Sequence, residues 1–213
     1  LPTGRDHNGE DRTAVCCLAS LNIETWDQWG DDPGLVEDVL RMLDNVLTSF
    51  IESAPDSMSR ARYSALRERS VGLGVMGFHS FLQSRRIPME SALAKSWNLR
   101  IFKKIRREAD SASVLLANER GACPDAQERG MRARFSHKIA IAPTASISII
   151  AGGTSACIEP IPANIYMHKT LSGAFAVRNI HLEKLFEEKG VNTTDTWQSI
   201  VAQEGSVQHL DFL

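Results

Sequence analysis

The feature that most constrains the fold is an alternation of short apolar runs with two long amphipathic stretches. Apolar side chains recur every three or four residues over residues 36–51 and again over residues 91–120, which is the spacing of one buried helix face. Residues 14–18 and 138–141 are short and mostly apolar, as is typical of strands buried on both faces. This alternation predicts an α/β fold with the helices outside the strands.

The ends of the expected helices carry capping signals. The Asp-Asp-Pro sequence at residues 31–33 predicts an N-cap and a first-turn proline for the first long helix. Gly121 predicts the end of the second long helix. Two shorter helices are expected over residues 179–189 and 194–203, because a glycine follows each of these stretches shortly after its last apolar position.

The composition limits the classes of function. The chain has 213 residues, 43% of them hydrophobic, and a formal net charge of −2. A near-neutral balance does not favour binding to nucleic acid or to an anionic membrane surface. No apolar run approaches the roughly 18 residues of a membrane helix, and the polar N-terminus does not resemble a signal peptide. We expect a cytoplasmic protein in which residues 1–213 form a single region.

The four cysteines are Cys16, Cys17, Cys123 and Cys157. They show neither a Cys-x-x-Cys spacing nor a nearby pair of histidines. The sequence therefore predicts no metal site and no disulfide framework of the kind found in secreted proteins. The adjacent Cys16 and Cys17 lie in an apolar run, where a cysteine is either a small hydrophobic residue or a redox-active thiol.

A glycine-rich segment matches a nucleotide-binding motif to the letter. Residues 72–77 read GLGVMG, the Gly-x-Gly-x-x-Gly pattern of dinucleotide sites. Residues 66–70 before it do not form an apolar strand, and residues 95–97 offer no acidic side chain for a ribose. The segment is better interpreted as a glycine-rich strand packed closely against a neighbour. A nicotinamide-dependent oxidoreductase remains a distant alternative.

A turn of small and hydroxyl residues follows the apolar run at 138–141. Thr144, Ala145, Ser146 and Ile147 come directly after Pro143. Small residues allow backbone N–H groups and hydroxyls to approach an anion closely, and a helix beginning there would add its dipole. The turn is thus a candidate phosphate site, and an ordinary capped turn is the alternative.

Five segments, in order, resemble the large subunit of ribonucleotide reductase. Residues 140–152 (AIAPTASISIIAG) resemble its IAPTASIS-type motif, and residues 154–160 (TSACIEP) the SxGIEP-type segment that follows it. Residues 71–78 (VGLGVMGF) match a glycine-rich strand, residues 14–22 (AVCCLASLN) match an AVCNLASIN-type segment, and residues 168–173 (HKTLSG) continue the similarity. The resemblance covers nearly the whole chain.

This resemblance implies a fold and a chemistry. The family has a ten-stranded α/β barrel made of two antiparallel halves of five parallel strands, with a thiyl radical on an internal finger loop. It reduces ribonucleotides to deoxyribonucleotides, the precursors of DNA. The chain is most similar to the class that reduces ribonucleoside diphosphates with a dimetal-radical small subunit and is re-reduced by thioredoxin or glutaredoxin. No cofactor is then expected on this chain itself.

The resemblance also assigns residues. Cys16 matches the member of the redox-active cysteine pair that follows the finger loop, whereas Cys17 stands where many relatives have Asn or Thr. Thr144, Ala145, Ser146 and Ile147 match the turn that binds the substrate phosphates, so they are the expected substrate-binding residues. One departure is residues 134–137, which read RFSH where RNSH is more usual.

The resemblance further suggests that the chain is part of a larger catalytic unit. The radical cysteine, the first redox cysteine and the specificity loops are expected upstream of residue 1, and the radical-transfer tyrosines downstream of residue 213. We therefore expect the C-terminal half of the barrel, truncated at both ends, which is inactive until it joins the N-terminal part of the large subunit.

Two further interpretations stay open. One is a fragment of an adenosylcobalamin-dependent (class II) ribonucleotide reductase, a class that shares the glycine-rich strand and the IAPT-type motif. The other is a non-catalytic half-barrel that acts as a scaffold or assembly module. The thiol of Cys16 distinguishes the scaffold interpretation from the enzyme interpretation, because a scaffold needs no thiol at that position.

Overall fold

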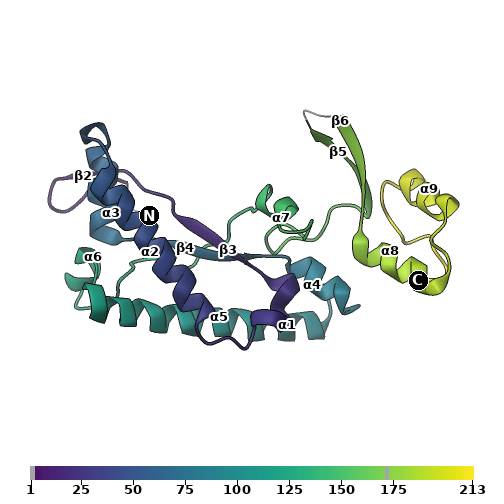
Figure 1. The fold of residues 1–213 in the computed structure, drawn as a ribbon, viewed down its shortest axis with the longest axis horizontal. Coiled ribbons are helices and arrows are strands. Elements are labelled where there is room, and N and C mark those ends of the chain that lie inside the picture. Colours follow the sequence, from purple (N-terminus) through teal and green to yellow (C-terminus); the bar gives the residue numbers. More distant parts are fainter. Residues whose placement is uncertain (1–2, 171–172) are drawn as a thin grey trace.

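The computed structural model of the chain describes residues 3–170 and 173–213. Figure 1 shows an elongated arrangement in which the long helix α5 (Ala92–Arg120) runs beneath two central strands, β3 (Leu18–Asn22) and β4 (Gly72–Met76). Helix α2 (Leu35–Ser53) lies beside α5 on the same side of these strands. The C-terminal helices form a second, smaller group at the opposite end from the N-terminus.

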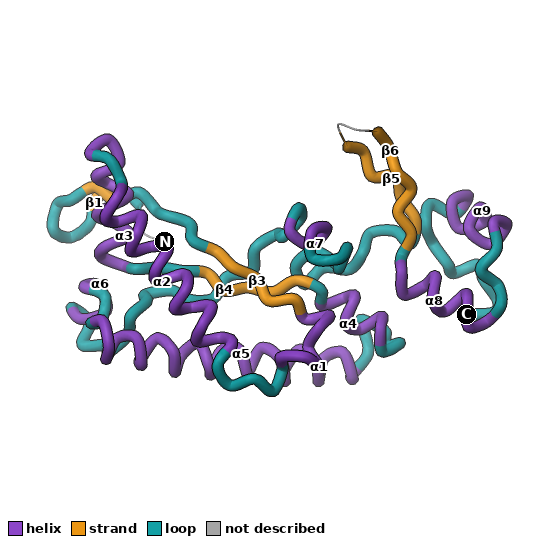
Figure 2. Tube along the Cα trace, in the orientation of Figure 1, coloured by secondary structure: helices purple, strands orange, loops and turns teal. Residues whose placement is uncertain are grey.

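The central strands run parallel, as the α/β interpretation predicted. β3 pairs with β4 in the register Leu18↔Gly72 to Asn22↔Met76, and a parallel bridge joins Leu73 to Ile139 on the other side of β4. Helices connect these three segments, as Figure 2 shows, because parallel neighbours need a crossover. The arrangement is part of an α/β barrel with its helices outside.

The other elements are short. Between β3 and β4 lie η1 (Ile23–Thr25), α1 (Trp26–Trp29), α2, η2 (Asp56–Met58) and α3 (Ser59–Glu68). After β4 come α4 (Phe78–Ser84), α5, α6 (Pro124–Gln127) and α7 (Ile147–Ile150). At the N-terminal end, β1 (Gly4–Arg5) pairs antiparallel with β2 (Asp11–Arg12). No helix within residues 3–170 and 173–213 is long and apolar enough to cross a membrane.

Two predicted boundaries were wrong. The strand expected over residues 14–18 begins only at Leu18, because the ladder with β4 starts where Leu18 faces Gly72. Helix α2 begins at Leu35 with Gly34 as its N-cap, and the carboxylate of Asp32 instead accepts the Gly34 N–H (2.8 Å) in the preceding turn. For α5, the Ser91 hydroxyl accepts the Ala94 N–H (3.1 Å), and the helix ends before Gly121 as predicted.

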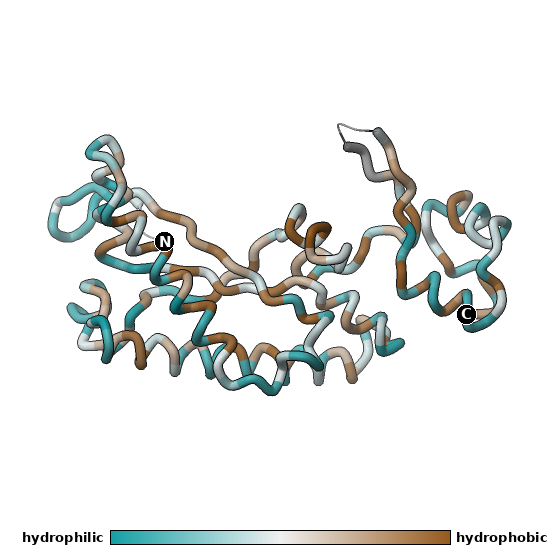
Figure 3. Tube along the Cα trace, viewed as in Figure 1, coloured by the Kyte–Doolittle hydropathy of each residue, from teal (hydrophilic) through white to brown (hydrophobic). Residues whose placement is uncertain are grey.

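The apolar faces of the two long helices build the main core. Helix α2 contributes Val36, Leu40, Leu43 and Leu47, all of which are buried. They pack with the buried stripe of α5 and the β4 side chains in one continuous cluster. Figure 3 shows the hydrophobic stretches of both helices and a hydrophobic α7. Unlike the core helices, α7 exposes its isoleucines, with Ile150 84% accessible.

The C-terminal part has its own small core. An antiparallel hairpin, β5 (Ile165–Thr170) with β6 (Gly173–Arg178), leads into α8 (Ile180–Lys189) and α9 (Thr194–Ala202). The aromatic rings of Phe186 and Trp197 meet edge to face, with their centroids 5.4 Å apart, in this second cluster. Both helices match the expected ranges, whereas Leu171 and Ser172 of the HKTLSG segment lie outside the described residues.

The glycines of β4 are required for close packing. A Cβ on Gly72 would lie 2.4 Å from Leu18 Cδ2 and 2.8 Å from Ala140 Cβ. A Cβ on Gly74 would lie 2.4 Å from the backbone oxygen of Ala140. The Gly-x-Gly-x-x-Gly pattern therefore reflects three chain segments in close contact, as the packing interpretation predicted.

Asp44 is a fully buried carboxylate that forms ion pairs with three arginines. It accepts hydrogen bonds from Arg69 (2.6 Å and 3.0 Å), Arg120 (2.8 Å) and Arg134 (3.0 Å). Burial raises the pKa of Asp44, but the hydrogen bonds from Arg134, Arg120 and Arg69 outweigh it, so that the net pKa is lowered. Arg134 is nearly buried beside the buried Phe135. Its hydrogen bond to Asp44 explains how an arginine is accommodated at this position.

Replacing Gly74 with alanine should lower the free energy of unfolding by about 1–3 kcal/mol, because a backbone oxygen cannot move aside as a side chain can. Urea unfolding followed by circular dichroism measures the change. Gly34→Ala is the matched control, since its Cβ would meet only Asp32 Oδ1 at 3.5 Å and its φ is −99°. Equal stability of the two variants would contradict the packing argument.

Replacing Asp44 with asparagine should cost about 3–5 kcal/mol, because it leaves buried arginine charges without a counter-ion. The pKa of Asp44 is lowered in the folded state, so its contribution is present above the unfolded pKa of about 4 and is lost as the pH falls through the folded pKa. Urea unfolding at pH 7 and at pH 3 tests both points. A variant as stable as the wild type at pH 7 would refute them.

Candidate functional site

Cys16 and Cys17 lie at the entrance to β3 and face different surroundings. Cys16 is exposed, whereas Cys17 is partly buried against the main core, with its Sγ 3.8 Å from the Leu43 carbonyl oxygen. Burial raises the pKa of the Cys17 thiol, and the neighbouring Cys16 raises it further. The thiolate is the reactive form of cysteine. Of the two adjacent thiols, Cys16 is therefore the one placed for chemistry with an external group.

A small cavity of about 170 Å³ opens beside Cys16. Its walls come from the three neighbouring segments of the sheet, and they include Cys17, Gly72, His137 and Ala140. The Gly72 N–H donates to the Cys17 carbonyl (2.9 Å), and the Val71 N–H donates to the His137 carbonyl (3.0 Å). These bonds hold the cysteine pair on one side of β4 and His137 on the other, around one shared space.

The turn at Thr144, Ala145, Ser146 and Ile147 follows the same segment. Thr144 is buried with a φ of +51°, and its hydroxyl oxygen accepts the Cys157 N–H at 2.7 Å. Its carbonyl accepts the Ser148 N–H at 3.0 Å, which starts α7. Thr144 thus ties the turn to residues 154–157 and sets its shape.

The other three residues of the turn are exposed. Within the described part of the chain, the backbone N–H groups of Ala145, Ser146 and Ile147 make no hydrogen bond. The Ser146 side chain does not cap α7 and is free to bind another group. The turn therefore presents several donors to solvent, which is the arrangement that an anion requires.

Sequence reasoning missed a second polar group, centred on Glu24. The Nε2 atom of His181 in α8 lies 3.2 Å from Glu24 Oε1, and the His181 side chain is only 9% accessible. The neighbouring His181 lowers the pKa of Glu24. Together with His79, these residues line a cavity of about 760 Å³ between α4 and α8. No local sequence pattern could reveal this pair, because its members lie at opposite ends of the chain.

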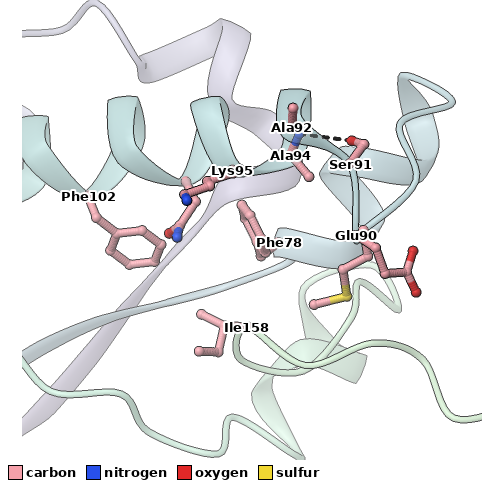
Figure 4. Close-up of a pocket in the computed structure, with 10 residues that line it drawn as sticks. Phe78, Glu90, Ser91, Ala92, Ala94, Lys95, Phe102 and Ile158 are labelled. Carbon is pink, nitrogen blue, oxygen red and sulfur yellow. Dashed lines mark hydrogen bonds between the residues drawn. The ribbon is translucent and has the colours of Figure 1, made fainter.

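A third cavity lies at the start of α5 and is separate from the cysteines. It has a volume of about 560 Å³, and its walls are largely apolar. Figure 4 shows Phe78, Lys95 and Phe102 around it, with Ile158 opposite them. It shares no lining residue with the Cys16 cavity. Among the residues that the structure describes, no cluster of His, Cys, Asp or Glu is arranged to hold a metal ion.

Comparison with known proteins identifies the family of the chain. Residues 6–132 and 124–213 match the family model described as ribonucleotide reductase, barrel domain. The chain is 47% identical over 203 residues to the ribonucleoside-diphosphate reductase large subunit of Invertebrate iridescent virus 6, with 93% of this chain and 21% of that protein covered. For the protein of the same name from Invertebrate iridescent virus 3, the values are 46% identity, 96% and 32%.

A solved structure shows the same fold. The Actinobacillus ureae class Id ribonucleotide reductase alpha subunit matches with a TM-score of 0.83 and 37% identity, over 93% of this chain and 36% of that one. The chain thus spans about a fifth to a third of the length of these relatives. On the family match over nearly all of its residues, the chain belongs to the ribonucleotide reductase barrel-domain family.

Proposed function

We propose that the chain is part of the catalytic large subunit of a class I ribonucleotide reductase, which converts ribonucleoside diphosphates to 2′-deoxyribonucleoside diphosphates. Residues 1–213 would form one region of its barrel, in the cytoplasm, where free thiols such as those of this chain are maintained. The observation that carries the proposal is the exposed Cys16 thiol beside a strand segment that leads directly into a donor-rich turn.

In this proposal Cys16 is one member of a redox-active pair. Two thiols together release two electrons and two protons as they form a disulfide, and the substrate takes up the electrons as its 2′-hydroxyl leaves as water. Thioredoxin or glutaredoxin then reduces the disulfide by thiol exchange. The exposure of Cys16 supports this role, because exchange requires access to the sulfur atom.

The turn would hold the diphosphate. The N–H groups of Ala145, Ser146 and Ile147 and the Ser146 hydroxyl would donate to phosphate oxygens, and such bonds to a charged acceptor are stronger than bonds between neutral groups. Thr144 would act mainly by shaping the turn through its bond from Cys157. Ser148 supports the shape as well, because its hydroxyl donates to the Ala145 carbonyl at 3.3 Å.

The remaining chemistry would come from partners. The radical cysteine would belong to the N-terminal part of the large subunit, and a dimetal small subunit would generate the radical. This chain would bind no cofactor of its own and would be inactive alone. The scaffold alternative gains no support from the structure, because a scaffold does not require an exposed thiol at Cys16.

A complementation assay tests the proposal. The chain, the upstream part of a large subunit, a small subunit, thioredoxin with its reductase, and CDP should together form dCDP, whereas neither half alone should. Cys16→Ser should lower turnover by about a hundredfold or more, because serine cannot form the disulfide. Cys17→Ser is the matched control and should keep most of the activity. Equal activity of the two variants would refute the assignment, and activity with adenosylcobalamin alone would indicate the cobalamin class.

Replacing Ser146 with alanine should raise the KM for CDP by about tenfold with little change in kcat, because it removes one hydrogen bond to the charged phosphates. Steady-state kinetics of the complemented enzyme measures both constants. Ser111→Ala, at an exposed serine of α5, is the control. An unchanged KM for Ser146→Ala would show that the hydroxyl does not contact the substrate.

A further inference from the structure

A chain of hydrogen bonds leads from a buried acid to the cavity beside Cys16. Glu68, at the end of α3, is 1% accessible, and each of its carboxylate oxygens accepts a serine hydroxyl. Ser64 donates to Oε1 at 3.0 Å and Ser70 donates to Oε2 at 2.9 Å. The Ser70 oxygen lies 3.2 Å from Nδ1 of His137, and the Ser136 oxygen lies 3.1 Å from the same nitrogen.

This network is held rigidly by the backbone. The Ser136 N–H donates to the Glu68 carbonyl (3.0 Å), and the Val71 N–H donates to the His137 carbonyl (3.0 Å). The side chain of Arg134, two residues before Ser136, is anchored on the buried Asp44. The backbone of His137 is therefore held by the Val71 N–H, and its imidazole ring is held by Ser70 and Ser136.

The hydrogen bonds of Ser70 provide an acceptor for a proton on Nδ1 of neutral His137. A serine hydroxyl has one proton, and Ser70 donates its proton to Glu68. The Ser70 oxygen can therefore only accept from His137 Nδ1 and from the Ser136 hydroxyl, which lies 2.8 Å away. The Ser70 oxygen is therefore available to accept a hydrogen from Nδ1, and in that tautomer the lone pair of His137 lies on Nε2. No hydrogen bond engages Nε2 within the part of the chain that the structure describes.

His137 shares the cavity of about 170 Å³ with Cys16. Among the described residues of its wall, the other titratable side chain is Cys17, whose pKa is raised by burial, and Glu68 lies behind Ser70. His137 and the exposed Cys16 thus both line one small space, and its described lining holds no carboxylate or amine side chain. A neutral histidine in this tautomer is suited to take a proton from a thiol.

We propose that His137 is the acid–base partner of Cys16, and that Glu68 acts through Ser70 as the residue that positions the imidazole. The Cys16 S–H bond breaks, its proton moves to Nε2 of His137, and a thiolate and an imidazolium result. Glu68 accepts the Ser70 hydroxyl, which leaves the Ser70 oxygen as an acceptor beside Nδ1 of His137. No oxidant or further reactant is needed for this step.

The inference deepens the proposed function but can fail separately from it. In thiol exchange, the imidazolium would return its proton to Cys16 when that sulfur leaves as a thiolate. The proton transfer itself needs neither substrate nor partner subunit. A chain with no reductase activity could still show it, and a fully active enzyme could lack it.

The rate at which iodoacetamide alkylates Cys16 tests the proposal on the chain as it stands. Peptide mass spectrometry separates Cys16 from the buried or partly buried thiols over pH 5.5 to 9.5. His137→Gln should slow alkylation of Cys16 by about fivefold to tenfold near neutral pH, because the thiolate loses its imidazolium partner. The rates should converge near pH 9.5, where hydroxide removes the proton instead.

Two further variants separate this role from a structural one. His209→Gln changes an exposed histidine of the C-terminal part and should keep the wild-type pH profile. Ser70→Ala cuts the link to Glu68 but keeps His137, and should give an intermediate profile with an unchanged circular dichroism spectrum. A His137→Gln profile equal to that of the wild type, or slowed equally at every pH, would overturn the proposal.

Discussion

The close contact of three backbone segments at β4 is the constraint on which the rest of the structure depends. Gly72 and Gly74 allow β3 on one side and residues 139–140 on the other to approach within distances that no side chain would permit. This contact positions both parts of the candidate site, the Cys16 thiol and the turn at Thr144. Cys16 directly precedes β3, and the turn follows residue 140. A looser strand would separate the thiol, His137 and the turn.

The ion pairs of the buried Asp44 provide the second support. Asp44 on α2 accepts hydrogen bonds from arginines at the end of α3, at the end of α5 and in the segment before His137. Moving these charges out of water is costly, so the complete set of ion pairs adds little to the stability of the fold. Removing one partner destabilises the fold strongly, because it leaves a buried charge unpaired. We interpret the ion pairs of Asp44 as contacts that determine where these three segments meet. The placement of His137 and Ser136 follows from it.

The site itself combines an exposed group with buried support. Cys16 and the N–H groups of the turn face outward, where a substrate or another chain can reach them. Glu68, Ser70 and Thr144 are buried; Ser70 links Glu68 to His137, and Thr144 fixes the turn through its hydrogen bond from Cys157. This division is expected of a catalytic surface, because reactive groups need access whereas their orientation needs rigid neighbours.

The sequence by itself predicted the two long helices, the two C-terminal helices, the glycine-rich strand and the family, because periodicity, glycine spacing and ordered motifs are local properties of the chain. It did not predict α3, α4 or the β5–β6 hairpin. It misplaced the start of β3, since a strand begins where its partner allows and the partner Gly72 is distant in sequence. Only the tertiary structure decided the pairs Glu68 with His137, Glu24 with His181, and Asp44 with its arginines. These contacts join side chains that no sequence spacing relates, because the packing of the helices on the strands brings them together.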